Sequence, residues 1–172
     1  MLSDALLHRL RNGVALLHDF SDDDVREFVG HCSAQNRSAG ERIIAEGEHG
    51  RAMYIVLAGT LRVLNTAVYP PVQLAELAAG DTFGELALLD FGARSACVDT
   101  LTEVRLLEFD RSQLVRIPLL QTKLYHNLAL MLAERLRETN ALVGMLAAGT
   151  RGGGMHASQT DAQAKRQMLN RH

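Results

Sequence analysis

Glu85 and Arg94 are the two side chains whose types and spacing could do chemistry in this chain. They lie in a largely apolar stretch, residues 83–98, with Gly84 and small residues around Arg94 leaving the backbone accessible. An arginine beside free backbone N–H groups suits an anionic phosphate, and a carboxylate can accept a hydrogen bond from a sugar hydroxyl. The pair therefore predicts a nucleoside monophosphate pocket. A purely structural Glu85–Arg94 salt bridge is the alternative that spacing alone does not exclude.

The charges of such a pocket must balance. A phosphate beside Glu85 is repelled unless positive charge compensates for the carboxylate. Arg94 supplies one unit, and the N-terminus of a short helix expected over Leu86–Leu89 supplies partial charge and unpaired N–H groups. Glu85 can then stay ionised and accept from a hydroxyl. We expect a 2′-deoxy ligand to bind about 1–3 kcal/mol more weakly, the usual effect of leaving a buried polar group unpaired.

Short β-rich runs separated by glycines fill residues 40–110 and must hold this stretch in place. Ala58-Gly59 separates two of them at hairpin distance. Many short strands with turns between them are typical of an antiparallel jelly-roll β-barrel, the double-stranded β-helix. The fold class is thus mainly β with flanking helices. The strands are expected at 41–45, 53–57, 60–64, 72–77, 95–100 and 104–109.

Helical patterns flank the barrel on both sides. Apolar spacing predicts one helix over 2–17, and Ser21 followed by three aspartates predicts the start of a second that ends near Cys32. After a short helical segment at Ser112–Ile117, a long helix is expected from Leu120 to Ala147. The predicted domain covers residues 1–147, with helices over 2–32, the barrel over 40–110 and C-terminal helices over 112–147. A flexible tail is expected over 148–172, because three consecutive glycines, 152–154, precede mostly polar residues.

The long helix carries an apolar seam with alternating spacings of three and four residues. That heptad spacing predicts a two-stranded coiled coil and hence a homodimer through this helix. Packing of the seam on the barrel is the alternative. The seam residues are Ala129, Leu132, Leu136, Thr139, Val143 and Leu146.

Composition limits the classes of function and the cellular location that the sequence is consistent with. The chain has 172 residues and a net charge of −2, which argues against a nucleic-acid groove spread over its surface. No apolar run approaches the length of a membrane span, and the N-terminus does not read as a signal peptide. Cys32 and Cys97 are interpreted as reduced thiols, although a disulfide is possible. These features together predict a cytoplasmic protein.

Residues 83–98 strongly resemble the phosphate-binding cassette of cyclic-nucleotide-binding domains. That cassette reads Phe-Gly-Glu-(Leu/Ile)-Ala-Leu, then a spacer, then Arg-(Ala/Ser/Thr)-Ala, and this chain fits it without an insertion. Individually weak turn and strand motifs extend the resemblance over about residues 14–145. They lie at 46–48, 53–56, 59–61 and 77–81.

The resemblance implies a role for each matching residue. Arg94 pairs with the cyclic phosphate, Glu85 accepts from the ribose 2′-hydroxyl, and Gly84 allows close approach of the sugar. Ser95 and Ala96 offer backbone N–H groups to the phosphate, and the Ser95 hydroxyl can add a bond. Phe83, Leu86 and Ala87 complete the cassette part of the predicted ligand site.

The long helix also resembles its counterpart in bacterial catabolite-activator proteins, over residues 132–140. The resemblance implies that Thr139 and Asn140 face the adenine amino group and that the helix closes over the ligand, with the 112–117 segment as hinge. Both residues could equally be ordinary helix-surface residues. Ala93 replaces a proline common in the family. In parts of the family a hydroxyl at the position of Ser95 is associated with tolerance for cGMP, so the choice between cAMP and cGMP stays open, with cAMP favoured. A cyclic dinucleotide also stays open.

The expected function is a stand-alone, non-enzymatic cyclic-nucleotide sensor that acts on an unidentified protein partner. No metal, direct nucleic-acid contact or membrane contact is expected. A complete transcription regulator needs a helix-turn-helix after the long helix, where only the glycine-rich tail remains, so the chain would then be an effector fragment. A metal-dependent cupin needs clustered histidines in strands, and the seven histidines are scattered. A protein-interaction module that has lost its ligand is a further alternative.

Overall fold

The chain forms two units, Met1–Ala129 and Leu130–His172, in the computed structural model, which describes residues 4–90 and 92–169. Side-chain surroundings are described to Ala148. The first unit contains every strand and the predicted cassette, and the second contains most of the long helix.

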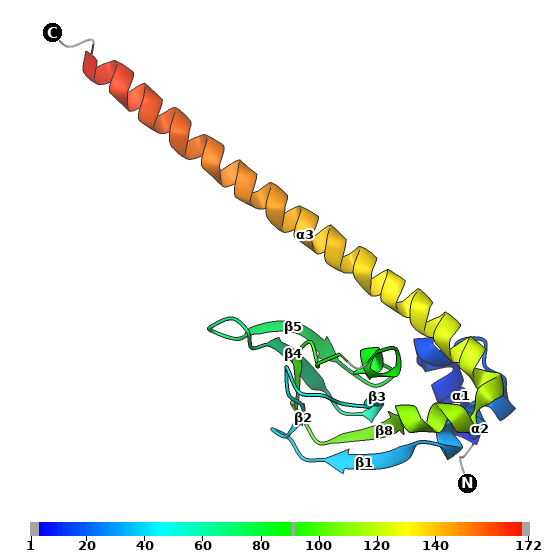
Figure 1. Ribbon diagram of the computed structural model, residues 1–172. Helices are drawn as coiled ribbons and strands as arrows, with labels where there is room; N and C mark the ends of the chain where they lie inside the picture. The colour runs from blue at the N-terminus through cyan, green and yellow to red at the C-terminus, as the bar shows by residue number, and fades with distance from the viewer. Residues whose placement is uncertain (1–3, 91, 170–172) are drawn as a thin grey trace. The chain divides into compact units, whose positions relative to one another are not determined.

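Two four-stranded antiparallel sheets make up the centre of the first unit (Figure 1). This arrangement confirms the predicted antiparallel jelly-roll fold, as two sheets and not a closed barrel. One sheet has the order β1 (Ser33–Arg37), β8 (Val104–Asp110), β3 (Ala52–Ala58), β6 (Thr82–Phe83), and the other β2 (Arg42–Ile44), β7 (Cys97–Thr100), β4 (Leu61–Asn65), β5 (Val72–Leu77).

The core lies where the apolar faces of these strands meet. Successive strand residues point to opposite faces. Ile44 pairs in register with Val98, which pairs with Val63. Strand β8 also reaches the helices, where the Phe109 ring stacks on Phe28 at 4.8 Å. The buried core cluster is Ile44, Val56, Leu61, Leu77, Phe83, Val98, Val104 and Leu106.

The N-terminal helices gather at one end of the sheets with the start of the long helix (Figure 1). The predicted start of the second helix is confirmed: α2 covers Asp22–Gly30, and Ser21 and Asp24 cap it reciprocally. The single helix expected over 2–17 is wrong in part. It divides into α1 (Asp4–Gly13) and the 3₁₀ turn η1 (Ala15–Leu17). Val14 between them has an extended backbone, although Val14 and Leu17 are both buried at the spacing of a helix face.

Two strands lie outside the predicted set. Strand β1 has the polar sequence SAQNR, which shows no apolar alternation, and it pairs with β8 at the edge of its sheet. The sheets therefore begin at Ser33, not at Gly40. Strand β6 has only two residues. Strand β7 begins at Cys97 instead of Ser95, because Ser95 and Ala96 belong to the turn that leaves the cassette.

The C-terminal helices differ at both ends from the prediction. The 3₁₀ helix η3 covers Arg111–Arg116, and α3 covers Pro118–Leu169. Proline fits the first turn of a helix, since the N–H that it lacks would have no partner there. At the other end the backbone stays helical beyond Ala147, over residues for which a flexible tail was predicted. Glycine disfavours a helix by about 1 kcal/mol per residue but keeps its N–H, so residues 152–154 do not end the hydrogen-bond ladder.

Candidate functional site

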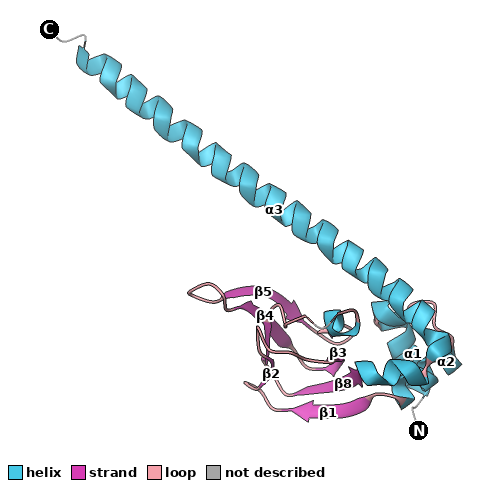
Figure 2. Cartoon of the chain, viewed as in Figure 1, coloured by secondary structure: helices cyan, strands magenta, loops and turns pink. Residues whose placement is uncertain are grey.

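The predicted cassette connects β6 to β7 and contains a short 3₁₀ helix, η2 (Glu85–Leu88), drawn in Figure 2 as a small turn near β3. It begins one residue before the predicted Leu86–Leu89. Gly84 precedes it with φ at 73°, a left-handed conformation that side chains rarely adopt. The sequence thus places a glycine where the chain must turn sharply from β6 into the cassette.

A cavity of about 90 Å³ lies within the cassette. Glu85 and Arg94 both line it, as their spacing predicted, so the structure brings the two charged residues to one small space. The sequence also predicted Gly84, Leu86, Ala87 and Ser95. The complete lining is Gly84, Glu85, Leu86, Ala87, Asp90, Gly92, Ala93, Arg94 and Ser95.

The Arg94 guanidinium is oriented by the main chain. Nη1 donates to the Gly84 carbonyl at 2.9 Å and Nη2 donates to the Ala52 carbonyl at 2.7 Å. Nε is buried and has no hydrogen-bond partner in the part of the chain that the structure describes. A buried donor without an acceptor is unfavourable, so Nε is an unused donor for an anionic ligand.

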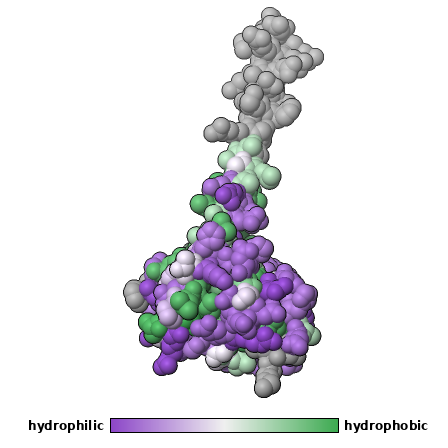
Figure 3. All heavy atoms as spheres, turned by 90° about the vertical axis from the view of Figure 1, so that its right-hand side faces the viewer, coloured by the Kyte–Doolittle hydropathy of each residue, from purple (hydrophilic) through white to green (hydrophobic). Residues whose placement is uncertain are grey.

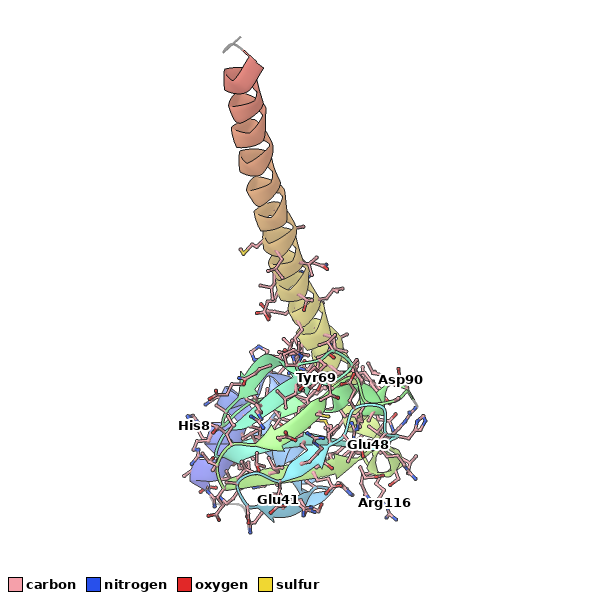
Figure 4. All side chains as sticks on the ribbon, turned by 90° about the vertical axis from the view of Figure 1, so that its left-hand side faces the viewer. His8, Glu41, Glu48, Tyr69, Asp90 and Arg116 are labelled. Carbon is pink, nitrogen blue, oxygen red and sulfur yellow. The ribbon has the colours of Figure 1, made fainter. Side chains whose placement is uncertain are left out.

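The loop between β2 and β3 holds the backbone of Arg94 on its other side. Arg94 N donates to the Glu48 carbonyl at 2.8 Å, and Gly47 N donates to the Arg94 carbonyl at 2.9 Å. His49 and Ala93 form an isolated antiparallel bridge between the same two segments. Figure 4 labels Glu48, which belongs to this loop, and Asp90, which belongs to the cassette. Arg94 is therefore fixed by the cassette, by β3 and by this loop.

Glu85 is 5% exposed and lines the same cavity. Carboxylates are rarely this buried unless they interact with other groups. If Glu85 and Arg94 formed a purely structural salt bridge, the guanidinium would donate its hydrogen bonds to the carboxylate. The two hydrogen bonds of the guanidinium instead have main-chain acceptors, Gly84 and Ala52.

Asp90 is a cavity residue that the sequence reasoning missed. Its Oδ1 accepts from Gly92 N at 3.0 Å, and its carbonyl accepts from Arg111 Nη1 at 2.8 Å. The Asp-x-Gly sequence is a common turn signal and could have indicated this bend. The cavity thus has two carboxylates and one guanidinium, so a bound phosphate must lie on the Arg94 side.

Four residues of the predicted site do not line the cavity. Phe83 is buried in the core and stacks on Tyr54 at 5.0 Å, because its side chain faces the inside of the sheets. Ala96 is part-buried next to the lining. Thr139 and Asn140 lie in the second unit, where Thr139 Oγ1 donates to the Arg135 carbonyl at 2.8 Å. Their contact with a base stays a prediction.

Other kinds of site are not seen among the described residues. Within residues 4–90 and 92–148, whose side chains the structure describes, His, Cys, Asp and Glu form no group of three that could hold a metal ion. The same part of the chain has no helix with the length and apolarity needed to cross a bilayer. Both cysteines are free, as predicted, and burial raises the pKa of the Cys32 thiol to about 12, which makes it a poor nucleophile.

Comparison with known proteins supports the resemblance of residues 83–98 to the phosphate-binding cassette of cyclic-nucleotide-binding domains. The model of the cyclic nucleotide-binding domain matches residues 34–118. The chain is 32% identical over 139 residues to the cyclic AMP receptor protein of Thermus thermophilus, covering 78% of this chain and 62% of that one. It is 34% identical over 102 residues to a CRP-like cAMP-activated global transcriptional regulator of Mycobacterium tuberculosis, covering 59% and 46%.

A solved structure, the Thermus thermophilus catabolite activator protein, superimposes with a TM-score of 0.72 at 30% identity, covering 77% of this chain and 63% of that one. The chain spans less than two thirds of the length of these curated relatives. The matched region contains both sheets and the whole Glu85–Arg94 cavity. Residues 34–118 of the chain belong to the family of cyclic-nucleotide-binding domains.

Proposed function

We propose that this protein is a non-enzymatic sensor that binds cAMP in preference to cGMP and acts in the cytoplasm. The observation that carries the proposal is that Arg94, whose buried Nε has no hydrogen-bond partner among the described residues, lines the same cavity as Glu85. The family supports cyclic-nucleotide binding in general. The names of the Thermus and Mycobacterium relatives support cAMP.

In this proposal the cassette residues divide the ligand between them. Arg94 donates from Nε to an oxygen of the cyclic phosphate while its Nη atoms stay on the main-chain carbonyls. Ser95 and Ala96 offer backbone N–H groups to the same phosphate. Glu85 accepts from the ribose 2′-hydroxyl, and the bend at Gly84 lets the sugar approach the backbone.

The cavity is small for a whole nucleotide. Its volume of 90 Å³ is below the range of about 300–1,000 Å³ typical of ligand pockets. It suits the phosphate and part of the sugar, which leaves the base outside. We assign the base to Thr139 and Asn140, with closure of α3 as the signal and η3 as its hinge. Such a population shift is limited by how much better the ligand binds the closed state.

The proposal includes a homodimer through α3. Leu136, Val143 and Leu146 of the predicted seam are more than half exposed in the single chain, and Figure 3 shows apolar surface along this stretch of the helix. Contiguous exposed apolar surface indicates an interaction site, and heptad spacing favours a second helix as its occupant. An unidentified protein partner would read the closed state.

The test is calorimetric titration of the nucleotide-free protein with cAMP and then cGMP. We expect micromolar or tighter binding of cAMP in wild type. Arg94→Ala should weaken binding by about 2–5 kcal/mol, the usual effect of removing one partner of a buried charge pair. Arg26→Ala, which removes an exposed arginine from α2, is the matched control and should bind as wild type does. Unchanged affinity in Arg94→Ala would refute the assignment.

A second titration tests the role of Glu85. Wild type should bind 2′-deoxy-cAMP about 1–3 kcal/mol more weakly than cAMP, because Glu85 then lacks its hydroxyl partner. In Glu85→Ala the two ligands should bind equally. If the folded, nucleotide-free protein gives no heat with either mononucleotide, an interaction module or a cyclic-dinucleotide sensor becomes the better assignment.

A further inference from the structure

Gly50, in the loop between β2 and β3, lies directly against the Arg94 guanidinium. A Cβ atom built at position 50 would be 2.4 Å from Nε, 2.4 Å from Nη2 and 2.6 Å from Cζ of Arg94. Real Cβ atoms essentially never come within 3.0 Å of another heavy atom in such contacts. The guanidinium therefore occupies the space that any side chain at position 50 would need.

Space, and not backbone conformation, makes glycine necessary here. The positive-φ glycines of the described chain are Gly40, Gly47, Gly59, Gly80 and Gly84, so Gly50 lies outside the left-handed region. An alanine could adopt the backbone of Gly50 without strain if Arg94 were absent. The contact with Arg94 is thus a separate requirement at this position.

The guanidinium fits a slot with a glycine on each side. A Cβ atom at Gly84 would be 2.8 Å from Arg94 Nη1, and one at Gly50 would meet the opposite, Nε–Nη2 edge. From within this slot Nη1 and Nη2 reach the carbonyls of Gly84 and Ala52, and Nε keeps its free hydrogen. If the guanidinium leaves the slot, it loses these bonds together.

We propose that Gly50 is a positioning residue for the anion site: its missing side chain lets Arg94 lie in the slot, held by the Gly84 and Ala52 carbonyls, where it lines the cavity proposed for the cyclic phosphate. This rests on the proposed function of Arg94. A side chain at position 50 leaves the charge of Arg94 intact and moves it. Because the atoms in contact are the end of a flexible side chain, Gly50→Ala should fold with the guanidinium displaced.

The first test measures cAMP affinity by calorimetry. Gly50→Ala should bind cAMP at least about tenfold more weakly than wild type, as expected when a charge-assisted hydrogen bond is lost. Gly30→Ala is the matched control, since nothing lies within 4 Å of its Cβ position and its φ is not positive. It should bind within about twofold of wild type. Wild-type affinity in Gly50→Ala would overturn the inference.

The second test needs no ligand. Thermal unfolding of the ligand-free protein is measured for wild type, Gly50→Ala, Arg94→Ala and the double variant. Gly50→Ala should lower Tm in the presence of Arg94. In the Arg94→Ala background it should leave Tm unchanged or raise it, because the slot is empty and alanine restricts the unfolded chain. An equal fall in both backgrounds would show that position 50 does not act through Arg94.

The two tests separate this inference from the proposed function. If wild type does not bind cAMP, the proposed function fails, and the Tm cycle still decides whether Gly50 makes room for Arg94. If wild type binds cAMP and Gly50→Ala binds it equally well, the function stands and the positioning role fails.

Discussion

Residues 118–129 and residues 130–148 belong to the same helix, α3, but their apolar side chains have different surroundings. In the first stretch Leu120, Leu124 and Leu128 are buried at a spacing of four residues. In the second stretch the large apolar side chains are mostly exposed, as Figure 3 shows. These exposed residues are Leu130, Leu136, Leu142, Val143, Met145 and Leu146.

Polar contacts follow the same division. Asn127, buried, donates from Nδ2 to the Leu16 and His18 carbonyls and so joins α3 to η1. Lys123 forms an ion pair with Asp24, which is part of the cap of α2. Both contacts involve the first stretch. Tertiary packing within the first unit therefore stabilises the start of α3, whereas the large apolar side chains of the second stretch are mostly exposed.

Leu124→Ala should have the largest effect on stability. Leu124 is fully buried, so truncation leaves a cavity and should lower the free energy of unfolding by about 2–5 kcal/mol. Leu136→Ala, the matched change in the second stretch, should alter it by less than about 0.5 kcal/mol at concentrations where the protein is monomeric. Urea denaturation measures both. Equal losses would abolish the contrast between the stretches.

Asn127→Ala should have the next largest effect. It leaves the Leu16 and His18 carbonyls without their donor, which should lower the free energy of unfolding by about 1–3 kcal/mol. Asn140→Ala removes the same side chain from an exposed position of the second stretch and is the control. If Asn127→Ala is as stable as the control, the buried amide does not join the helices.

Leu136→Lys tests the seam as a dimer interface. A charge at a seam position should weaken dimerisation about tenfold or more, since the alternative is a buried unpaired ammonium. Sedimentation equilibrium measures the dissociation constant, with Ala141→Lys, at an exposed position off the seam, as the charge-matched control. A wild-type protein that stays monomeric at high concentration would contradict the proposed dimer.

Asp24 should give the smallest effect, visible in the pH dependence of stability. Burial raises its pKa, but hydrogen bonds from Lys123 and Ser21 together lower the pKa by more than burial raises it. The pKa of Asp24 is therefore below its ordinary value of 3.8. Its stabilising contribution is thus fully present above pH 3.8 and is lost as the pH falls through the lowered pKa.

In Asp24→Asn that acid-dependent loss should disappear. The difference from wild type at neutral pH should be below about 1 kcal/mol, because the Lys123 side chain is 45% exposed and the pair is screened. Urea denaturation across a pH series measures it. A variant with the wild-type pH profile below pH 4 would mean that Asp24 does not contribute to it.

Local signals account for what could be predicted. The cassette is continuous in sequence, so residue types and spacing were enough to find Glu85 and Arg94 in one cavity. The capping pattern at Ser21 and most strands were also predictable, because each depends on neighbours along the chain.

The remaining features depend on contacts between distant segments. Gly50 and Ala52 meet Arg94 across more than forty residues, and nothing in the local sequence marks that contact. Strand β1 is polar and exists because β8 pairs with it. Phe83 fits the cassette pattern, yet the pleat of β6 turns it into the core. The glycines at 152–154 suggested an end to α3 that helical hydrogen bonding does not require.

The two carbonyls that hold Arg94 also bear on the thermodynamics of recognition. A long side chain that is immobilised only on binding loses conformational entropy, which opposes association by about 0.5–1.5 kcal/mol. The Arg94 side chain is already confined by Gly84 and Ala52 without a ligand, so that loss accompanies folding and not binding. The anion site is in this sense preorganised, so binding an anion should not incur this entropy loss.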